Sequence, residues 1–229
     1  MKKITLLLLI FLVLSCNKKV IELPEINHSD IAEIQDVSAA YLFYNETQPD
    51  SVELNRKNLI STTNWLVNVD KRLTLKQAIP HIKFLQEKKA NGAHKNENAK
   101  NYFTCHDTSR NNLGFLEFTN LEYTEGGIFS NYENYSKVSD LRSLKNQISI
   151  NFNSSNIARI LNMESDSASQ KIVKSELINR LKQIDSSKNR IYLVFNSSLL
   201  FQDYISFKEL ISKADIKNAK ISNKESIYN

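Results

Sequence analysis

Apolar and polar positions alternate along the chain in patterns that predict strands and helices, and they are clearest between Arg190 and Ala214. Ile191 to Phe195 is an unbroken apolar run, which is typical of a strand covered on both faces. Polar residues at 196–198 then favour a turn. The apolar positions that follow recur at spacings of four and three, as on one face of a helix: Leu200, Tyr204, Phe207, Ile211 and Ala214. The pattern predicts a strand–turn–helix unit.

A similar unit occurs earlier in the chain. The segment WLVNVDKRLTLKQAIPHIKFL, Trp65 to Leu85, aligns without gaps on IYLVFNSSLLFQDYISFKELI, Ile191 to Ile211. Few residues are identical, so the match is one of pattern. We interpret it as an indication of two related modules, of which the earlier is the weaker.

The remaining patterns complete both modules. In the N-terminal module we expect a helix that begins at Thr74, with Gln77 completing a capping box and Pro80 causing a kink or a late start. In the C-terminal module we expect Ser175 to cap a helix with apolar positions at 177–184. Predicted strands cover residues 37–45, 52–54, 63–70, 102–108, 115–123, 147–152, 157–161, 171–174, 191–195 and 219–228.

The order of these elements predicts an α+β fold with two layers, a small mixed sheet and helices on one face. The C-terminal module, residues 139–229, has the order β-hairpin–α–β–α–β, and the N-terminal module covers residues 31–138. The segment 124–138 has little periodicity and contains Gly126 and Gly127, so we place the boundary there.

The start of the chain predicts export. Lys2 and Lys3 precede an apolar run at 4–14 that is too short to cross a bilayer comfortably, and Ser15 and Cys16 follow. The sequence VLSC, Val13 to Cys16, resembles the lipobox of bacterial lipoproteins. That resemblance implies removal of residues 1–15, lipid attachment at Cys16 and a location in the bacterial cell envelope. Residues 16–30, with Pro24, are then expected to form a tether.

The C-terminal module resembles the periplasmic domain of ExbD/TolR proteins. The residues that carry the resemblance are KIVKSELINRLKQI and the strand–turn–helix unit that follows it, and Asp70-Lys71 resembles the usual turn of the family. The resemblance covers residues 145–229, and 60–90 more weakly. It implies a module that pairs with itself and contacts envelope proteins or the cell wall. Residues 1–16 contain no Asp or Glu, so the proton-coupled role of the family's transmembrane helix is not carried over.

Composition narrows the functional classes. The net charge of +5 falls to +3 when Lys2 and Lys3 leave with the signal, which is too small to indicate nucleic-acid binding. With Cys16 acylated, Cys105 is the remaining thiol, so no intrachain disulfide is expected. The four glycines form no phosphate-binding loop, and we predict no cofactor.

Candidate catalytic and metal-binding residues are few. Cys105 and His106 could form a nucleophilic pair, but adjacent residues of a strand point to opposite faces. A metal site would draw on Cys105 and the histidines at 81, 94 and 106, which lack a recognised spacing. Asp70 is interpreted as a turn residue, and the lysines at 88, 89, 95 and 100 as a solvated loop that could meet anionic groups.

We therefore expect a non-catalytic envelope lipoprotein that binds a partner protein or a cell-wall polymer such as peptidoglycan. The alternative is a hydrolase or metal-dependent enzyme that uses the His and Cys residues of the N-terminal module. A strand that ends the chain often leaves backbone groups available for a partner or for a homodimer. The expected partner-binding residues are accordingly Ala219, Ile221 and Asn223.

Overall fold

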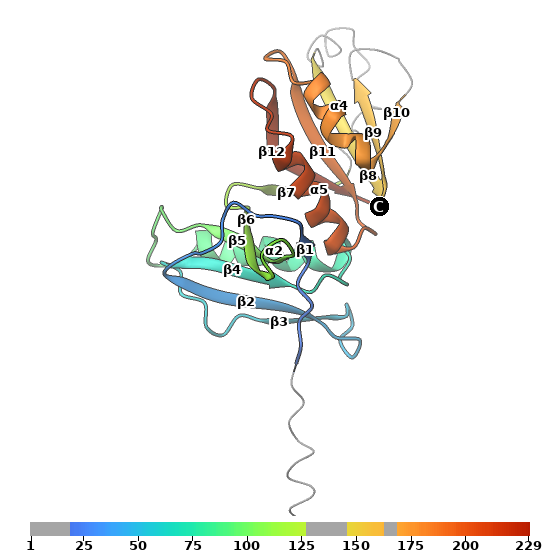
Figure 1. Ribbon diagram of the computed structural model, residues 1–229. Helices are drawn as coiled ribbons and strands as arrows, with labels where there is room; N and C mark the ends of the chain where they lie inside the picture. Colours follow the sequence, from blue (N-terminus) through green and yellow to red (C-terminus); the bar gives the residue numbers. More distant parts are fainter. Residues whose placement is uncertain (1–18, 127–145, 163–168) are drawn as a thin grey trace, which may run out of the picture.

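The computed structural model describes residues 19–126, 146–162 and 169–229. Within these ranges the chain forms two six-stranded mixed sheets and three α-helices, each helix lying on one face of its sheet (Figure 1). The predicted mixed class of helices and mixed sheets is confirmed. Cys16 and the residues around it lie outside the described part of the chain.

The first sheet is built around three parallel strands. Their order across the sheet is β5, β4, β2, and antiparallel β3 and β6 flank them. β4 pairs with the first residues of β5, 101–103, and β1 pairs with its last two, His106 and Asp107. The strands are β1 Glu25–Ile26, β2 Val37–Tyr44, β3 Val52–Asn55, β4 Asn64–Val69, β5 Asn101–Asp107 and β6 Asn112–Glu117.

Helix α2, Leu75–Ala90, connects β4 to β5 and covers one face of the first sheet. Its start is fixed by the capping box that the sequence predicts, because Thr74 accepts from the Gln77 amide and the Gln77 side chain accepts from the Thr74 amide. The helix begins at Leu75 and continues past Pro80, so the predicted late start does not occur. The side chains it buries are Leu75, Ala78, Ile79, Ile82 and Leu85.

The second sheet has the strand order β10, β9, β8, β11, β12, β7. Its strands are β7 Glu122–Glu125, β8 Gln147–Ser154, β9 Ile157–Asn162, β10 Gln170–Val173, β11 Arg190–Asn196 and β12 Lys220–Tyr228. Helices α4, Leu177–Gln183, and α5, Phe201–Lys213, cover one of its faces. Ser175 does not cap α4, contrary to prediction, because it lies inside a 3₁₀ turn at Lys174–Glu176 that leads into that helix.

The two sheets repeat one arrangement. In each, a hairpin strand, the strand before the long helix and the strand after it are parallel neighbours: β2, β4, β5 in the first and β8, β11, β12 in the second. We call the first sheet with α2 the first unit, and the second sheet with α4 and α5 the second unit. The gapless alignment of the sequence superimposes β4 and α2 on β11 and α5.

The turns that precede α2 and α5 are hydrogen-bonded to one another. The first two amides of each helix donate to carbonyl oxygens of the other unit, so each unit satisfies the helix start of the other. The four bonds are Leu75 N to Leu199 O at 2.9 Å, Lys76 N to Ser197 O at 2.9 Å, Phe201 N to Leu73 O at 2.7 Å and Gln202 N to Lys71 O at 3.2 Å. Buried aromatic rings continue this contact, and Phe103 of β5 meets Phe201 edge-on at 5.2 Å.

The change from one sheet to the other comes earlier than the predicted boundary. The predicted strand at 115–123 is two strands, β6 in the first sheet and β7 in the second, because a turn in which the Leu121 amide donates to Phe118 separates them. The second unit thus begins at Glu122, not near residue 139 as the division into 31–138 and 139–229 expects. Residues 127–138 of the predicted boundary lie outside the described residues.

The predicted tether is bound to the body over most of its described length. We call residues 22–31 the N-terminal segment, and its backbone amides donate to carboxylates of both units. Glu22 N donates to Asp70 at 3.3 Å, Asn27 N to Glu209 at 2.8 Å and Ser29 N to Asp107 at 2.9 Å. Ile26 adds a side chain that is only 2% exposed. These contacts fix the segment, which composition alone could not indicate.

Candidate functional site

The last strand, β12, is an edge strand over only part of its length. β7 pairs with Lys224–Ile227, so the expected free edge is absent there. The three residues predicted to bind a partner lie ahead of that pairing. Ala219 is buried and its amide donates to Asp185 at 2.6 Å, and Ile221 pairs with Ile191 of β11. Asn223 is exposed, and its amide group donates to the Asn120 carbonyl at 3.1 Å.

A bulge interrupts the pairing of β12 with β11 at this point. Ile221 stands opposite Ile191 and Glu225 opposite Leu193, so the three residues between them on β12 face the single residue Tyr192. The Lys224 amide donates to the Ser222 hydroxyl at 3.1 Å inside the bulge. Bulges redirect side chains and often mark functional positions.

The bulge opens a cleft of about 640 Å³, which we call the bulge cleft. Its lining holds three cationic side chains and no carboxylate. The lining residues are Arg190, Tyr192, Lys220, Ile221, Ser222, Asn223 and Lys224. A site with this composition is suited to an anionic group, which arginine and lysine recognise by charge-assisted hydrogen bonds.

Two of these cations stand side by side. Arg190 begins β11, Lys220 begins β12, and the register places them directly opposite one another. Like charges in cross-strand positions destabilise a sheet, so this pair has an unfavourable energy that a bound anion would offset. Within the described residues neither side chain has an ion pair. Lys224 lies 3.5 Å from Glu122, but both are exposed, so this pair is weak.

The lining of the bulge cleft offers groups that can contact a ligand. Arg190 and the two lysines supply charge, Asn223 an amide, and the half-buried Tyr192 a ring against which an apolar part of a ligand can pack. Sequence reasoning selected Ile221 and Asn223 but missed Arg190, Tyr192, Lys220 and Lys224 as site residues. The signal available was a basic residue at the start of each of two apolar strands, but the bulge that joins them has no clear sequence signature.

The proposed nucleophilic pair is not assembled. The Cys105 side chain is 0% exposed, and burial raises the pKa of its thiol far above the usual range. His106 points to the other face of β5, where its Nε2 lies 3.2 Å from the Asn111 amide oxygen. The negative charge of Glu209 raises the pKa of the thiol further, and a thiol that stays protonated is a poor nucleophile.

The histidines are likewise dispersed. His81 on α2 lies 2.8 Å from Asp50, and His94 lies in the loop after α2, where its carbonyl accepts from the Ser61 hydroxyl. In the described ranges, no three His, Cys, Asp or Glu side chains are grouped so that they could hold a metal ion.

Asp70 has the turn role that the sequence predicts. Its side chain is fully buried and accepts from the Arg72 guanidinium at 2.7 and 2.8 Å. Burial alone would raise the pKa of this carboxyl, but the bonds from Arg72 and from backbone amides outweigh it and lower the pKa. Asp70 thus stabilises the turn between β4 and α2.

The four lysines at and after the end of α2 differ in their surroundings: some bond to the protein and others are exposed to solvent. Lys89 donates to the Lys100 carbonyl and the Asn101 side chain, both at 2.9 Å, and its ammonium lies 5.3 Å from the centre of the Trp65 ring. Burial lowers the pKa of Lys89 to about 8. Lys88 is exposed, and Lys100 pairs with Glu117 at 2.9 Å.

Lys95 and Lys89 line a cleft of about 700 Å³. The same cleft is lined by the carboxylates of Glu87, Glu97 and Glu122, so its lining favours neither anions nor cations.

Comparisons of the chain with family models, with characterised proteins and with solved structures find no match.

Proposed function

We propose that this chain is a non-catalytic lipoprotein of the bacterial cell envelope that binds an anionic envelope component through its second unit. The observation that carries the proposal is the bulge cleft, in which Arg190, Lys220 and Lys224 gather without a carboxylate among the lining residues. Among envelope components, a cell-wall polymer such as peptidoglycan offers carboxylates and amides together, which suits the cations and Asn223. An acidic surface on a partner protein is the second candidate.

The arrangement of the second unit supports this proposal. It contains the hairpin β8–β9, helix α4, strand β11, helix α5 and strand β12 in chain order, with β7 and β10 added to the sheet. The first unit has a hairpin, strand, helix and strand, without a helix between the hairpin and the next strand. We propose that both units are ExbD/TolR-like modules. In this reading the contact between the turns before α2 and α5 is a pairing of two such modules within one chain.

The anchor is proposed from the sequence VLSC at Val13 to Cys16. Among the described residues, no helix is both long and apolar enough to cross a bilayer. Attachment of radiolabelled lipid to the wild-type chain, but not to Cys16→Ala, tests the anchor. Equal labelling of both would contradict it.

Binding is tested by sedimentation of the body, residues 17–229, with insoluble peptidoglycan. Loss of two charge-assisted contacts in Arg190→Ala/Lys220→Ala should weaken binding about tenfold or more, because one such contact contributes about 1.5 kcal/mol. Added salt should weaken wild-type binding more than binding of the variant.

The matched control is Lys76→Ala/Lys88→Ala, which removes the same charge from exposed positions of α2. If both double variants bind as the wild type does, or lose affinity equally, the bulge cleft is not the binding site. If only an acidic envelope protein is captured, and the capture requires Arg190 and Lys220, the partner is a protein instead of the polymer.

A further inference from the structure

The face of the first sheet opposite α2 is partly apolar and aromatic. Strand alternation places Val37, Ala39, Tyr41 and Phe43 of β2 on this face, with Leu66 of β4 beside them. We call these five residues the outer face. Val37 is 43% exposed, the other four are partly exposed, and the rings of Tyr41 and Phe43 stack with centres 5.7 Å apart. Tyrosine and phenylalanine rings in this state are suited to the boundary between water and lipid.

The start of the described chain is fixed beside this face. Lys19 forms an ion pair with Glu53, and Glu53 is the cross-strand neighbour of Phe43, so its side chain belongs to the same face. Three residues further, Glu22 pairs with Arg72 at 3.2 Å. Residues 19–22 thus lie along the strand ends of the first sheet, with Glu22 bonded to the turn after β4.

The length of chain before Lys19 limits how far the body can stand from an anchor. Cys16 is three residues from Lys19, a span of at most about 11 Å when fully extended. The polar layer of a bilayer is itself about 6 Å deep on each side. Because Lys19 is held against the sheet, a lipid on Cys16 brings the outer face to the membrane surface.

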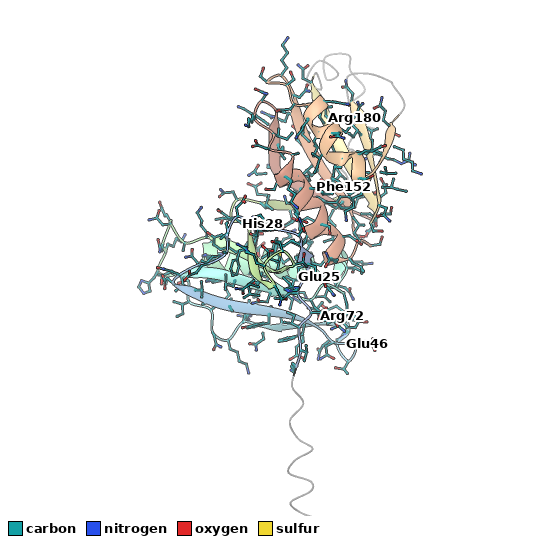
Figure 2. All side chains as sticks on the ribbon, in the orientation of Figure 1. Glu25, His28, Glu46, Arg72, Phe152 and Arg180 are labelled. Atoms are coloured by element: carbon teal, nitrogen blue, oxygen red, sulfur yellow. The ribbon has the colours of Figure 1, made fainter. Side chains whose placement is uncertain are left out.

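The other surfaces of the molecule face away from this position. α2 lies between the first sheet and the second unit, since Gln86 donates to the Leu121 carbonyl at 2.8 Å and Lys83 lies 3.4 Å from Glu125 (Figure 1). Figure 2 shows Arg72 and Glu46 at the end of the molecule near β3, and Arg180 of the second unit at the opposite end.

We propose that the outer face lies on the lipid surface that carries the anchor, so that the second unit projects away from the membrane. The inference rests on the lipid anchor of the proposed function. Strand register places one charged residue, Glu53, beside Phe43. The ion pair with Lys19 neutralises the charge of Glu53. Strand register also places Asn55, Asn64 and Asn68 among these side chains, so the contact is interfacial, and it does not require anionic lipid.

The test uses the full lipidated protein in vesicles of a neutral phosphatidylcholine. Single cysteines at Tyr41 and at Val37 carry a fluorophore, and Lys88→Cys on α2 and Lys171→Cys on β10 serve as controls. Cys105 is fully buried, so it should remain unlabelled in the folded protein. Circular dichroism checks the fold of each variant, and Val37→Cys, at an exposed position, covers the case in which Tyr41→Cys unfolds.

Quenching by a nitroxide on the lipid headgroup should be several-fold stronger at positions 37 and 41 than at 88 and 171. Equal quenching at all four positions, or stronger quenching at 88, overturns the inference while leaving the anchor intact. The lipid-labelling comparison of wild type with Cys16→Ala is made on the same preparation. Absence of lipid there removes the anchor itself, and that failure is distinguishable from a lipidated protein in another orientation.

Discussion

The two units have the same central topology, but they complete it differently. In the first unit, β5 has β6 along one side and β4 with β1 along the other, so both of its edges are covered. In the second unit, β7 covers only Lys224–Ile227 of β12, and the bulge begins in the uncovered part and ends at Lys224, where β7 starts to pair. The two units share one topology and differ at the edge of β12. The proposed site lies at that edge, where the second unit departs from the topology of the first.

The helix starts show a second difference. Thr74 and Gln77 form a capping box before α2, whereas Leu200, in the same position before α5, makes no side-chain cap. The α5 start is satisfied by the Leu73 and Lys71 carbonyls of the first unit. A leucine is tolerated at this position because the other unit accepts from the first two amides of α5 and the Leu200 carbonyl accepts from the Asp203 amide at 2.9 Å. Since the first two amides of α2 are bonded to the second unit in the same way, the comparison indicates that each unit depends on the other.

The largest expected effect tests that dependence. Phe152 of β8 is fully buried, and among the described residues its ring contacts are with Phe195, at 4.6 Å between ring centres, and Phe207, both of the second unit. Phe152→Ala should lower the free energy of unfolding by about 3–5 kcal/mol, because it leaves a cavity. The one tryptophan, Trp65, reports on the first unit. Its fluorescence transition in denaturant should shift with the circular dichroism transition. A Trp65 transition at the wild-type midpoint would show that the units unfold independently.

A somewhat smaller effect is expected at the ion pair that joins α5 to β12. Glu225 is 0% exposed, pairs with Lys208 and accepts from the Tyr204 hydroxyl at 2.6 Å, and Tyr204 lies 3.1 Å from the Tyr123 hydroxyl of β7. Lys208→Ala should cost about 3 kcal/mol, since it leaves a buried carboxylate without its cation. Adding Glu225→Gln to that variant should recover part of the loss. A double variant less stable than Lys208→Ala would contradict this account.

The sequence predicted the shared pattern of the units well and their differences poorly. Strand and helix spans follow from apolar periodicity, and the Thr74 capping box was predicted from residue types alone. The fixed N-terminal segment and the bulge depend on contacts between residues far apart in sequence, such as Asn27 with Glu209. Local propensity contains no information on such contacts. Arg190 and Lys220 of the bulge cleft are 30 positions apart in the chain, and only the register of β11 and β12 places them opposite one another.

Only strong acid should release the N-terminal segment from the carboxylates that bind it. Hydrogen bonds from Ser109 and from backbone amides hold the pKa of Asp107 well below its usual range, and the pKa of Asp70 is lowered as well. A carboxyl whose folded pKa is depressed stabilises above its unfolded pKa, near 4, and that contribution is lost as the pH falls through the folded pKa. The Ser29 amide resonance should therefore stay in place near pH 4 and shift only at a pH well below that value.

Asp107→Asn should show the released position of this resonance already at neutral pH. Asp215→Asn, at an exposed residue after α5, is the matched control and should titrate as the wild type does. A Ser29 resonance that already shifts near pH 4, or one that Asp107→Asn leaves unmoved at neutral pH, in a protein that remains folded, would show that the Asp107 carboxylate does not hold the segment.

The smallest expected effect separates the two helix starts. Thr74→Ala removes a side-chain cap and should lower the free energy of unfolding by about 1 kcal/mol. Leu200→Ala should change it by less than about 0.5 kcal/mol, since Leu200 is 43% exposed and caps nothing with its side chain. Leu200→Thr installs the cap of the first unit in the second, and should stabilise by up to about 1 kcal/mol where the Asp203 amide can donate to the new hydroxyl. Denaturant unfolding of the three variants measures this. If Leu200→Ala costs as much as Thr74→Ala, the Leu200 side chain stabilises the start of α5 by packing, and the two helix starts do not differ as the hydrogen bonds indicate.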